Sequence, residues 1–171
     1  MWTGRRKIGF LILVFIAAGA ISQIRSNNVN ETAVEMEISP LSNFCYSNQD
    51  IPIDVVFRNK GPENVRLLQN TFDDPQISKS FFRITLKSGD SPSYPLGGGG
   101  SVSFLKKLLK YVELKKDEEY KFRLNVRDFL PANYALKPGA YEVSIEYANR
   151  YGDDCFKGKL SSKPVTVTLS E

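Results

Sequence analysis

The amino-acid sequence predicts an all-β fold, and more specifically an antiparallel β-sandwich of about seven or eight strands. Apolar residues recur at every second position in six segments, turn-forming sequences separate these segments, and one short stretch departs from the pattern with helical spacing. Successive side chains of a strand point to opposite faces, so this alternation is typical of strands with one buried and one solvent-exposed face. At 171 residues with 42% hydrophobic residues, the chain is long enough for one domain with a substantial core.

The alternation locates the strands along the chain. The six alternating segments cover residues 34–38, 51–57, 82–86, 120–126, 141–147 and 165–169. Two weaker candidates are NVRLLQ, residues 64–69, and YVEL, residues 111–114. Turn-forming sequences separate them, such as NKGPEN after the second segment and LKPG before the fifth.

The stretch with helical spacing is FLKKLLKYVELKK, residues 104–116. Leu105, Leu108, Leu109 and Val112 recur there at helical intervals. We interpret the stretch as a loop that contains one helical turn at most and leads into the YVEL strand. A short amphipathic helix that caps the sandwich is the alternative.

The first twenty residues have the layout of a secretory signal peptide. Arg5, Arg6 and Lys7 form a basic start, the apolar run 8–21 follows, and Ala18-Gly19-Ala20 supplies the small residues that signal peptidase prefers. The run is shorter than the roughly 20 residues that a spanning helix needs. We therefore expect residues 1–20 to direct export to the periplasm or the medium and to be cleaved. An uncleaved anchor over residues 8–24 is the alternative.

The rest of the chain divides into a short tether and one domain. Residues 21–33 are polar and unpatterned and are predicted to be flexible, and residues 34–171 are predicted to form the sandwich. Outside the signal, 20 basic residues stand against 19 acidic ones. A domain so close to neutrality lacks the basic surface that nucleic acid binding requires. We expect the partner to be another exported or envelope protein, and contact with a membrane only through an uncleaved N-terminal segment.

One tyrosine stands directly after a rigid turn. Pro138 fixes one backbone angle and Gly139 permits a turn, so Tyr141 enters its strand at a set position. This arrangement resembles the tyrosine corner of immunoglobulin-like sandwiches, in which a tyrosine near the start of strand F bonds back to upstream backbone. Val143 occupies the place of the cysteine of antibody domains, and the only tryptophan, Trp2, is in the signal. The resemblance is therefore to the wider immunoglobulin-like class.

A second resemblance covers most of residues 35–169. It is carried by IPIDVVFRNKGPENVRLL, FFRITLKSGDSPSYPLGG, YVELKKDEEYKFRLNV and LKPGAYEVSIEY, in this order. Together they resemble the immunoglobulin-like accessory domains of exported bacterial proteins, and their layout is similar to the domain that precedes the catalytic part of deuterolysin-like metallopeptidases. The chain has no histidine, hence no HExxH zinc motif, and the catalytic part is absent. No functional residue is carried over.

The two cysteines, Cys45 and Cys155, are a candidate disulfide. An oxidising compartment favours a bond, which would stabilise by roughly 4 to 5 kcal/mol because it closes a long loop. The topology that the resemblance implies places the two cysteine loops at opposite ends of the sandwich, whereas a bond needs Cα atoms within about 7 Å. Both outcomes stay open at this point.

The sequence indicates no catalytic chemistry. Without histidine, the usual general base, the commonest zinc ligand and the histidine-activated nucleophiles are missing. The adjacent pairs Asp73-Asp74 and Asp153-Asp154 lack the acid spacing of a calcium loop and are interpreted as turn formers. We therefore expect no catalytic, cofactor-binding or metal-binding residues, and a protein that is not an enzyme.

Four aromatic residues fall in predicted loops: Tyr94, Phe104, Tyr134 and Tyr151. Loop tyrosines suit recognition surfaces because they are large and amphipathic at low entropic cost, although they can also pack over the ends of the sandwich. The leading hypothesis is a non-enzymatic protein-binding or accessory module that uses loops 88–104, 128–135 and 149–159. The alternative is a peptidase inhibitor that inserts the segment KSGDSPSYPLGGGGSVSF into a protease.

Overall fold

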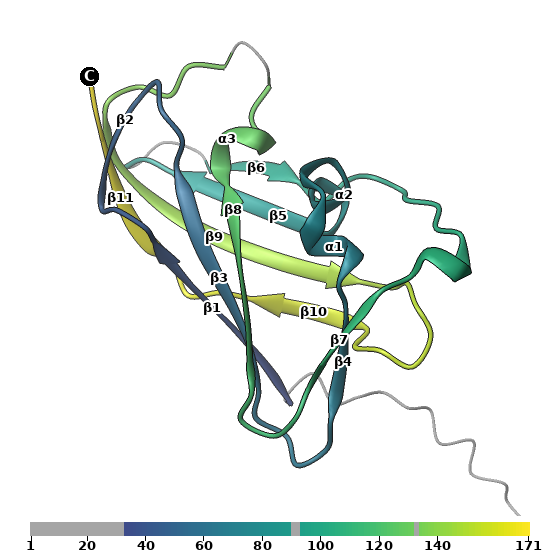
Figure 1. Cartoon of the computed structure of the whole chain (residues 1–171). Coiled ribbons are helices and arrows are strands. Elements are labelled where there is room, and N and C mark those ends of the chain that lie inside the picture. The colour runs from purple at the N-terminus through teal and green to yellow at the C-terminus, as the bar shows by residue number, and fades with distance from the viewer. Residues whose placement is uncertain (1–32, 90–92, 132–133) are drawn as a thin grey trace, which may run out of the picture.

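The described part of the chain is mostly β-structure arranged in antiparallel sheets (Figure 1). The computed structural model describes residues 33–171 except 90–92 and 132–133. The predicted signal peptide and nearly all of the predicted tether lie outside these residues. No helix within the described ranges is long and apolar enough to cross a membrane.

Sheet A consists of three antiparallel strands. Its spatial order is β1 (Val34–Pro40), β3 (Pro52–Asn59) and β8 (Glu119–Asn125). Val55 of β3 lies opposite Ile38 of β1 and Phe122 of β8, and all three belong to the core face. The strand alternation read from the sequence therefore sets which face of sheet A is buried.

Sheet B is built around the longest strand, β9 (Gly139–Asn149). Its spatial order is β2 (Phe44–Tyr46), β11 (Val165–Ser170), β9, β5 (Phe82–Lys87) and β6 (Tyr94–Gly97). A further strand, β10 (Gly158–Ser161), pairs with the C-terminal end of β9. All pairings in this sheet are antiparallel except that of β2 with β11.

A two-stranded antiparallel sheet extends the molecule beyond sheet A. It pairs β4 (Val65–Leu68) with β7 (Tyr111–Leu114), which follow β3 and precede β8 in the chain. The buried side chain of Asn59 ties the two turns together, because its Nδ2 donates to the carbonyls of Glu63 at 2.7 Å and Leu114 at 3.0 Å. These bonds satisfy backbone acceptors that the turns would otherwise leave buried.

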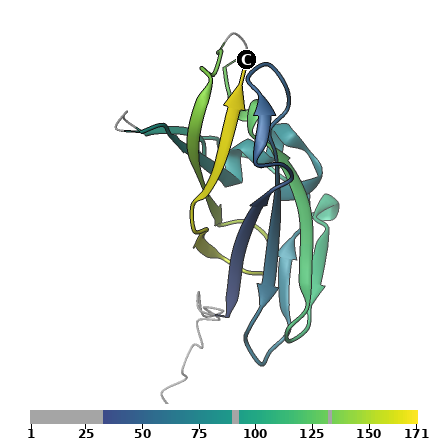
Figure 2. The ribbon, with the colours of Figure 1, turned by 90° about the vertical axis from the view of Figure 1, so that its left-hand side faces the viewer.

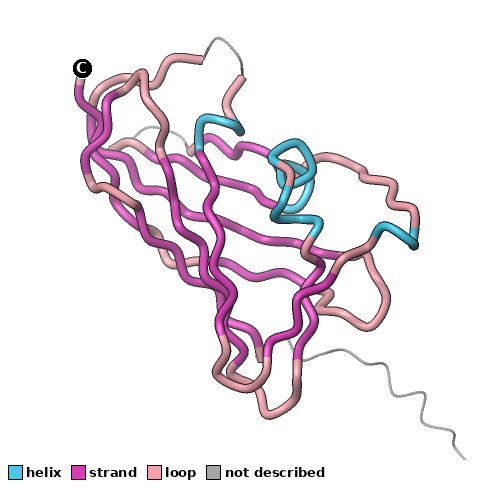
Figure 3. Tube along the Cα trace, in the orientation of Figure 1, coloured by secondary structure: helices cyan, strands magenta, loops and turns pink. Residues whose placement is uncertain are grey.

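The helical elements are short and lie in the connections between strands (Figure 3). They are α1 (Asn70–Asp73), α2 (Pro75–Phe81), the 3-10 turn η1 (Lys106–Leu108) and α3 (Val126–Phe129). Isolated helices of fewer than about 12 residues are marginal in water, so each of these short elements depends on packing against the sheets.

An aromatic cluster fills the space between sheets A and B, which the side view shows as separate layers (Figure 2). The rings of Phe57 on β3 and Tyr147 on β9 join the two sheets, with centroids 5.1 Å apart at an angle of 67°. Phe82 of β5 contacts both Tyr147 and Phe122 of β8, at 5.0 and 5.5 Å. Phe72 of α1 stacks on Phe122 at 4.6 Å and covers the cluster.

The six alternating segments are confirmed as β1, β3, β5, β8, β9 and β11, and the two weaker candidates as β4 and β7. The stretch 104–116 contains one 3-10 turn and then β7, as we expected. The predicted number of strands was too low. Strands β2, β6 and β10 have three or four residues each, which is too short for alternation to be recognised.

Helix α2 was not predicted, although the sequence carries a signal for it. Asp74 caps this helix by accepting a hydrogen bond from the Gln76 backbone N–H at 2.8 Å, and Pro75 follows at the first helical position. An acidic cap followed by proline is a typical helix start. The side chain of Asp74, interpreted above as a turn former, therefore has a capping role.

One acidic residue, Asp54, is nearly buried on the outer face of sheet A. It accepts a hydrogen bond from Arg123 Nε at 2.9 Å and pairs with Lys121 Nζ at 2.9 Å. These bonds, that of Arg123 first, lower the pKa of Asp54. Because the pKa is lower in the folded than in the unfolded state, the carboxylate stabilises the fold above an unfolded-state pKa of about 3.9, and this contribution is lost as the pH falls through the folded-state pKa.

The substitution Asp54→Asn should lower the free energy of unfolding at neutral pH, by about 1 kcal/mol because both cations are largely solvated. The difference from the unmodified protein should shrink at acidic pH, as the pH falls through the lowered folded-state pKa of Asp54. Urea denaturation at both pH values measures this, with Glu142→Gln as the control on an exposed strand position. An equal difference at both pH values would contradict the role assigned to this carboxylate.

The hydroxyl of Tyr147 is buried and makes no hydrogen bond of good geometry within the described residues. The neighbouring Thr71 hydroxyl donates instead to the Leu68 carbonyl at 2.7 Å. We expect Tyr147→Phe to change the free energy of unfolding by less than about 1 kcal/mol, because it removes a buried group without a partner. Tyr147→Ala should cost about 3 to 5 kcal/mol by opening a cavity between the sheets. Chemical denaturation compares the two variants, and a large loss in the phenylalanine variant would show that the hydroxyl is satisfied.

Candidate functional site

The four aromatic residues that were predicted to lie in loops divide into two pairs near opposite ends of β9, and one of them, Tyr94, is the first residue of strand β6 and not part of a loop. Tyr94 and Tyr134 line one pocket near the start of β9 and are 54% and 42% exposed. Phe104 and Tyr151 lie beyond its end, half-buried, with ring centroids 5.8 Å apart. Both of these rings also contact Phe81 of α2, at 6.1 and 5.5 Å. The structure therefore brings Tyr94 and Tyr134 together in one accessible place and uses Phe104 and Tyr151 in packing.

Tyr141 connects the start of β9 to the segment before it. Its Oη donates a hydrogen bond to the carbonyl oxygen of Lys137 at 2.9 Å. Gly139 has φ 146°, in the region that favours glycine, and so permits the turn between Pro138 and the strand. On the sheet, Tyr141 lies opposite Val167 of β11. The hydrogen bond holds residues 137–141 as one closed corner beside the pocket.

The pocket lies between the β5–β6 hairpin and residues 130–131 and 134–138, near the start of β9. Its volume is about 620 Å³, within the range of typical ligand pockets. Tyr94 lies opposite Leu86 in the β5–β6 register, so it is on the same face of sheet B as that buried leucine. The lining residues are Leu86, Ser88, Tyr94, Pro95, Leu96, Leu130, Pro131, Tyr134, Ala135, Leu136, Lys137, Pro138 and Tyr141. We call this the tyrosine pocket.

The polar side chains in the described lining of the tyrosine pocket are Ser88, Tyr94, Tyr134, Lys137 and Tyr141, of which the hydroxyls can donate and accept hydrogen bonds. Among the described residues of the lining, Lys137 is the only charged one, and none of them is a carboxylate or a side-chain amide. Asp90 and Asn133, which are neighbours of the lining residues in the sequence, lie outside the described residues. The Tyr141 hydroxyl is occupied by the Lys137 carbonyl, and the Pro131 carbonyl accepts from the Tyr134 backbone N–H at 2.9 Å. Within the described residues, the hydroxyls of Tyr94 and Tyr134 have no hydrogen-bond partner. The described lining can therefore hold a ligand through apolar contacts and hydroxyl groups.

Both cysteines are free thiols and lie far apart in the topology. Cys45 is on β2 opposite Leu169, next to the start of β9, whereas Cys155 contacts Asn149 at the end of β9. The bridged alternative of the sequence analysis is therefore not formed in this structure. Burial raises the pKa of each thiol, so neither is activated as a nucleophile.

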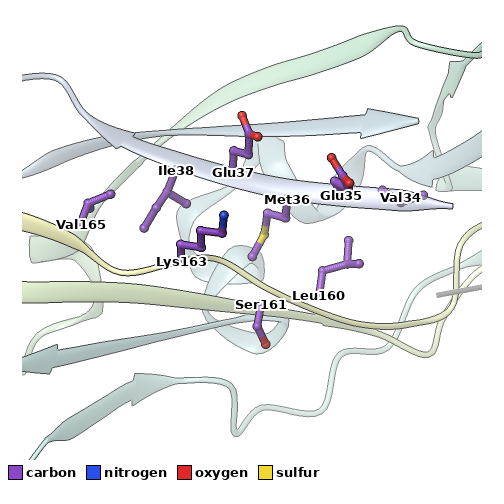
Figure 4. A pocket seen from close by; sticks show the side chains of 9 residues that line it. All are labelled: Val34, Glu35, Met36, Glu37, Ile38, Leu160, Ser161, Lys163 and Val165. Atoms are coloured by element: carbon purple, nitrogen blue, oxygen red, sulfur yellow. The ribbon is translucent and has the colours of Figure 1, made fainter. Parts of the chain in front are cut away.

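A second hollow separates the free edges of the two sheets (Figure 4). It has a volume of about 510 Å³ and lies between β1 and the β10–β11 region. Figure 4 shows Lys163 directed from the β10–β11 connection toward β1, on which Glu35 and Glu37 also lie. Charged residues at sheet edges are a common protection against unwanted strand pairing. We interpret this hollow as a protected edge and place the candidate site at the tyrosine pocket.

No protein-family model matches the chain, and no curated protein sequence matches it. Similar solved structures include a β-glucosidase from Erythrobacter marinus (11% identity, TM-score 0.41) and a glucose complex of a β-glucosidase from Listeria innocua (14%, 0.39). A third is the sporulation control protein Spo0M from Bacillus subtilis (10%, 0.40). The matches cover 80%, 81% and 81% of this chain but only 15%, 16% and 50% of those proteins. At these TM-scores the likeness supports no functional assignment.

The substitution Tyr141→Phe should lower the free energy of unfolding by about 0.5 to 1.5 kcal/mol, because it removes the hydrogen bond to the Lys137 carbonyl. Tyr134→Phe is the matched control, since the Tyr134 hydroxyl bonds to no described residue, and it should change stability by less than about 0.5 kcal/mol. Thermal or urea denaturation separates the two variants. Equal effects would argue against the corner bond as a stabilising contact.

Proposed function

We propose that the chain is an exported, non-enzymatic domain of the immunoglobulin-like β-sandwich type. The sandwich class is supported by two sheets that face one another across an aromatic core, and by β1 and β2, which pair with different sheets although they are adjacent in the chain. The hydrogen bond of Tyr141 near the start of β9 also supports it, because a tyrosine corner is a feature of this class. Export is supported by the N-terminal sequence alone.

We further propose that the domain binds another exported protein through the tyrosine pocket. One observation carries this proposal: two exposed tyrosines, whose hydroxyls bond to no described residue, line a pocket of about 620 Å³ in which the other described side chains are mostly apolar. Large aromatic side chains at low entropic cost are preferred at protein interfaces, and a pocket gives them a place to anchor a partner.

The alternative function, a peptidase inhibitor that inserts the segment KSGDSPSYPLGGGGSVSF into a protease, has less support. Within the segment that would insert into a protease, residues 94–97 pair with β5 and Phe104 packs against Phe81. The described part of this segment is therefore engaged in the fold. A recognition role at the pocket does not require any part of it to leave the sheet.

Binding should depend on the pocket tyrosines. We expect the intact chain, immobilised and exposed to native envelope or medium proteins, to retain a partner that the double variant Tyr94→Ala, Tyr134→Ala does not retain. Tyr46→Ala is the matched control, because Tyr46 is 53% exposed but does not line the pocket. Quantitative mass spectrometry of the retained proteins measures the difference. Equal retention by all three proteins would contradict binding at this pocket.

A further inference from the structure

Two exposed leucines lie on one turn, which consists of the 3-10 turn η1 and the residue before it. Leu105 and Leu108 are 63% and 58% exposed. The Leu108 N–H donates to the Leu105 carbonyl at 2.8 Å, and side chains three residues apart in a 3-10 turn lie on the same side. Single exposed leucines are ordinary, whereas two on one side of a turn form a small apolar surface. We call residues 105–110 the leucine tip; Figure 3 shows η1 as a short cyan segment at the margin of the molecule.

The other residues of this segment hold the leucine tip in place. The ring of Phe104 belongs to the aromatic group that packs beyond the end of β9, and Leu109 is half-buried against the core. The side chain of Asn70 bonds to the turn twice: its Nδ2 donates to the Leu108 carbonyl at 3.1 Å, and its Oδ1 accepts from the Lys110 N–H at 2.6 Å. The two leucines are therefore exposed on a braced turn, and their exposure does not result from a loose loop.

The charges of the leucine tip are all positive. The segment FLKKLLK, residues 104–110, contains three lysines and no acidic residue, and Lys107 and Lys110 are exposed. The loop beside the tip, residues 149–157, carries two exposed bases and two exposed acids: Arg150, Lys157, Asp153 and Asp154. Because the charges of that loop balance, the tip adds a local excess of positive charge to an apolar surface. This combination is typical of segments that lie on anionic membrane surfaces.

The leucine tip and the tyrosine pocket lie near opposite ends of β9. The ring contact of Phe104 with Tyr151 places the tip beside the loop beyond the end of β9, whereas the pocket lies near the start. Strand β1 begins at Val34, which lines the second hollow together with β10, the strand that pairs with the C-terminal end of β9. In a form that keeps the apolar run 8–24, residues 25–33 span at most about 30 Å. An anchored domain can therefore touch the membrane with the tip and hold the pocket away from it.

We propose that the leucine tip docks the domain on a membrane surface with anionic lipid headgroups. Leu105 and Leu108 insert among the lipids, and the amines of Lys107 and Lys110 stay at the level of the headgroup phosphates. Burial of leucine side chains is favourable, and the apolar stems of lysine can lie in the interface while the charge remains in water. This contact is additional to the one expected from an uncleaved N-terminal segment, and it does not rest on protein binding at the tyrosine pocket.

The test is methyl NMR of the intact chain, with labelled leucines, in lipid nanodiscs that contain anionic phospholipid and a phospholipid spin-labelled on its acyl chain. The spin label broadens only signals from groups close to the lipid, so an N-terminal segment in the bilayer does not imitate docking of the tip. We expect the methyl signals of Leu105 and Leu108 to broaden. Leu41 is the matched control, because it is 56% exposed but precedes β2 near the start of β9, and its signals should stay sharp.

Variants separate the apolar and the charged contributions to docking. The half-buried Leu109 is the probe, because it stays in place beneath the tip in every variant. The equilibrium constant for docking should fall about tenfold for each of Leu105→Ser and Leu108→Ser. It should fall about fivefold for each of Lys107→Gln and Lys110→Gln, and added salt or purely zwitterionic lipid should also reduce the broadening. Thermal denaturation checks that each variant is folded.

Three results would overturn the inference. Signals of Leu41 and Leu108 that broaden equally, or no broadening at all, would show that the tip is not placed at the membrane. The third is loss of a retained protein in the variant Leu105→Ser, Leu108→Ser without broadening in nanodiscs, which would assign the tip to a protein partner. The double variant Tyr94→Ala, Tyr134→Ala should dock like the unmodified chain, so docking and protein binding at the pocket can fail separately.

Discussion

The contact between Phe57 and Tyr147 is the interaction on which the rest of the structure depends. It joins the central strand of sheet A to the central strand of sheet B, and Phe72, Phe82 and Phe122 pack around it. Aromatic side chains bury much more surface than aliphatic ones, so a small number of them can hold two sheets together. This cluster fixes the position of β9, and β9 in turn carries both the corner at its start and the packed loop beyond its end.

The aromatic residues at the two ends of β9 differ in their surroundings. Beyond the end of β9, Tyr151 and Phe104 pack on Phe81, and the backbone N–H of Asp153 donates to the Tyr111 hydroxyl at 3.2 Å, which ties that loop to β7. At the start of β9, the Tyr141 bond holds the corner closed while Tyr94 and Tyr134 remain exposed around a hollow. Beyond the end of β9 the aromatic rings are therefore used in packing, whereas near its start the hydroxyls of Tyr94 and Tyr134 bond to no described residue.

The long strands could be predicted from the sequence because each has one buried face, and burial imposes alternation on residues such as Val143, Ile145 and Tyr147. The short strands β2, β6 and β10 could not, since three or four residues are too few for alternation to be recognised, and β2 in addition pairs with β11, which is distant in sequence. The helix start at Asp74-Pro75 was readable from its capping signal but was interpreted as a turn. Tyr94 and Tyr134 could be proposed as recognition residues, but their meeting in one pocket depends on the β5–β6 register and on the corner at Tyr141, which only the tertiary structure reveals.

The most direct test of this account is a nuclear Overhauser spectrum of the intact chain with selectively labelled phenylalanine and tyrosine rings. The account predicts strong cross-peaks between the rings of Phe57 and Tyr147, because their centroids lie 5.1 Å apart in the interior. It also predicts that both rings are protected from a soluble paramagnetic probe, whereas Tyr94 and Tyr134 are not. Absence of the Phe57–Tyr147 cross-peaks, with both rings accessible to the probe, would contradict the packing of the two sheets and the position of the pocket that depends on it.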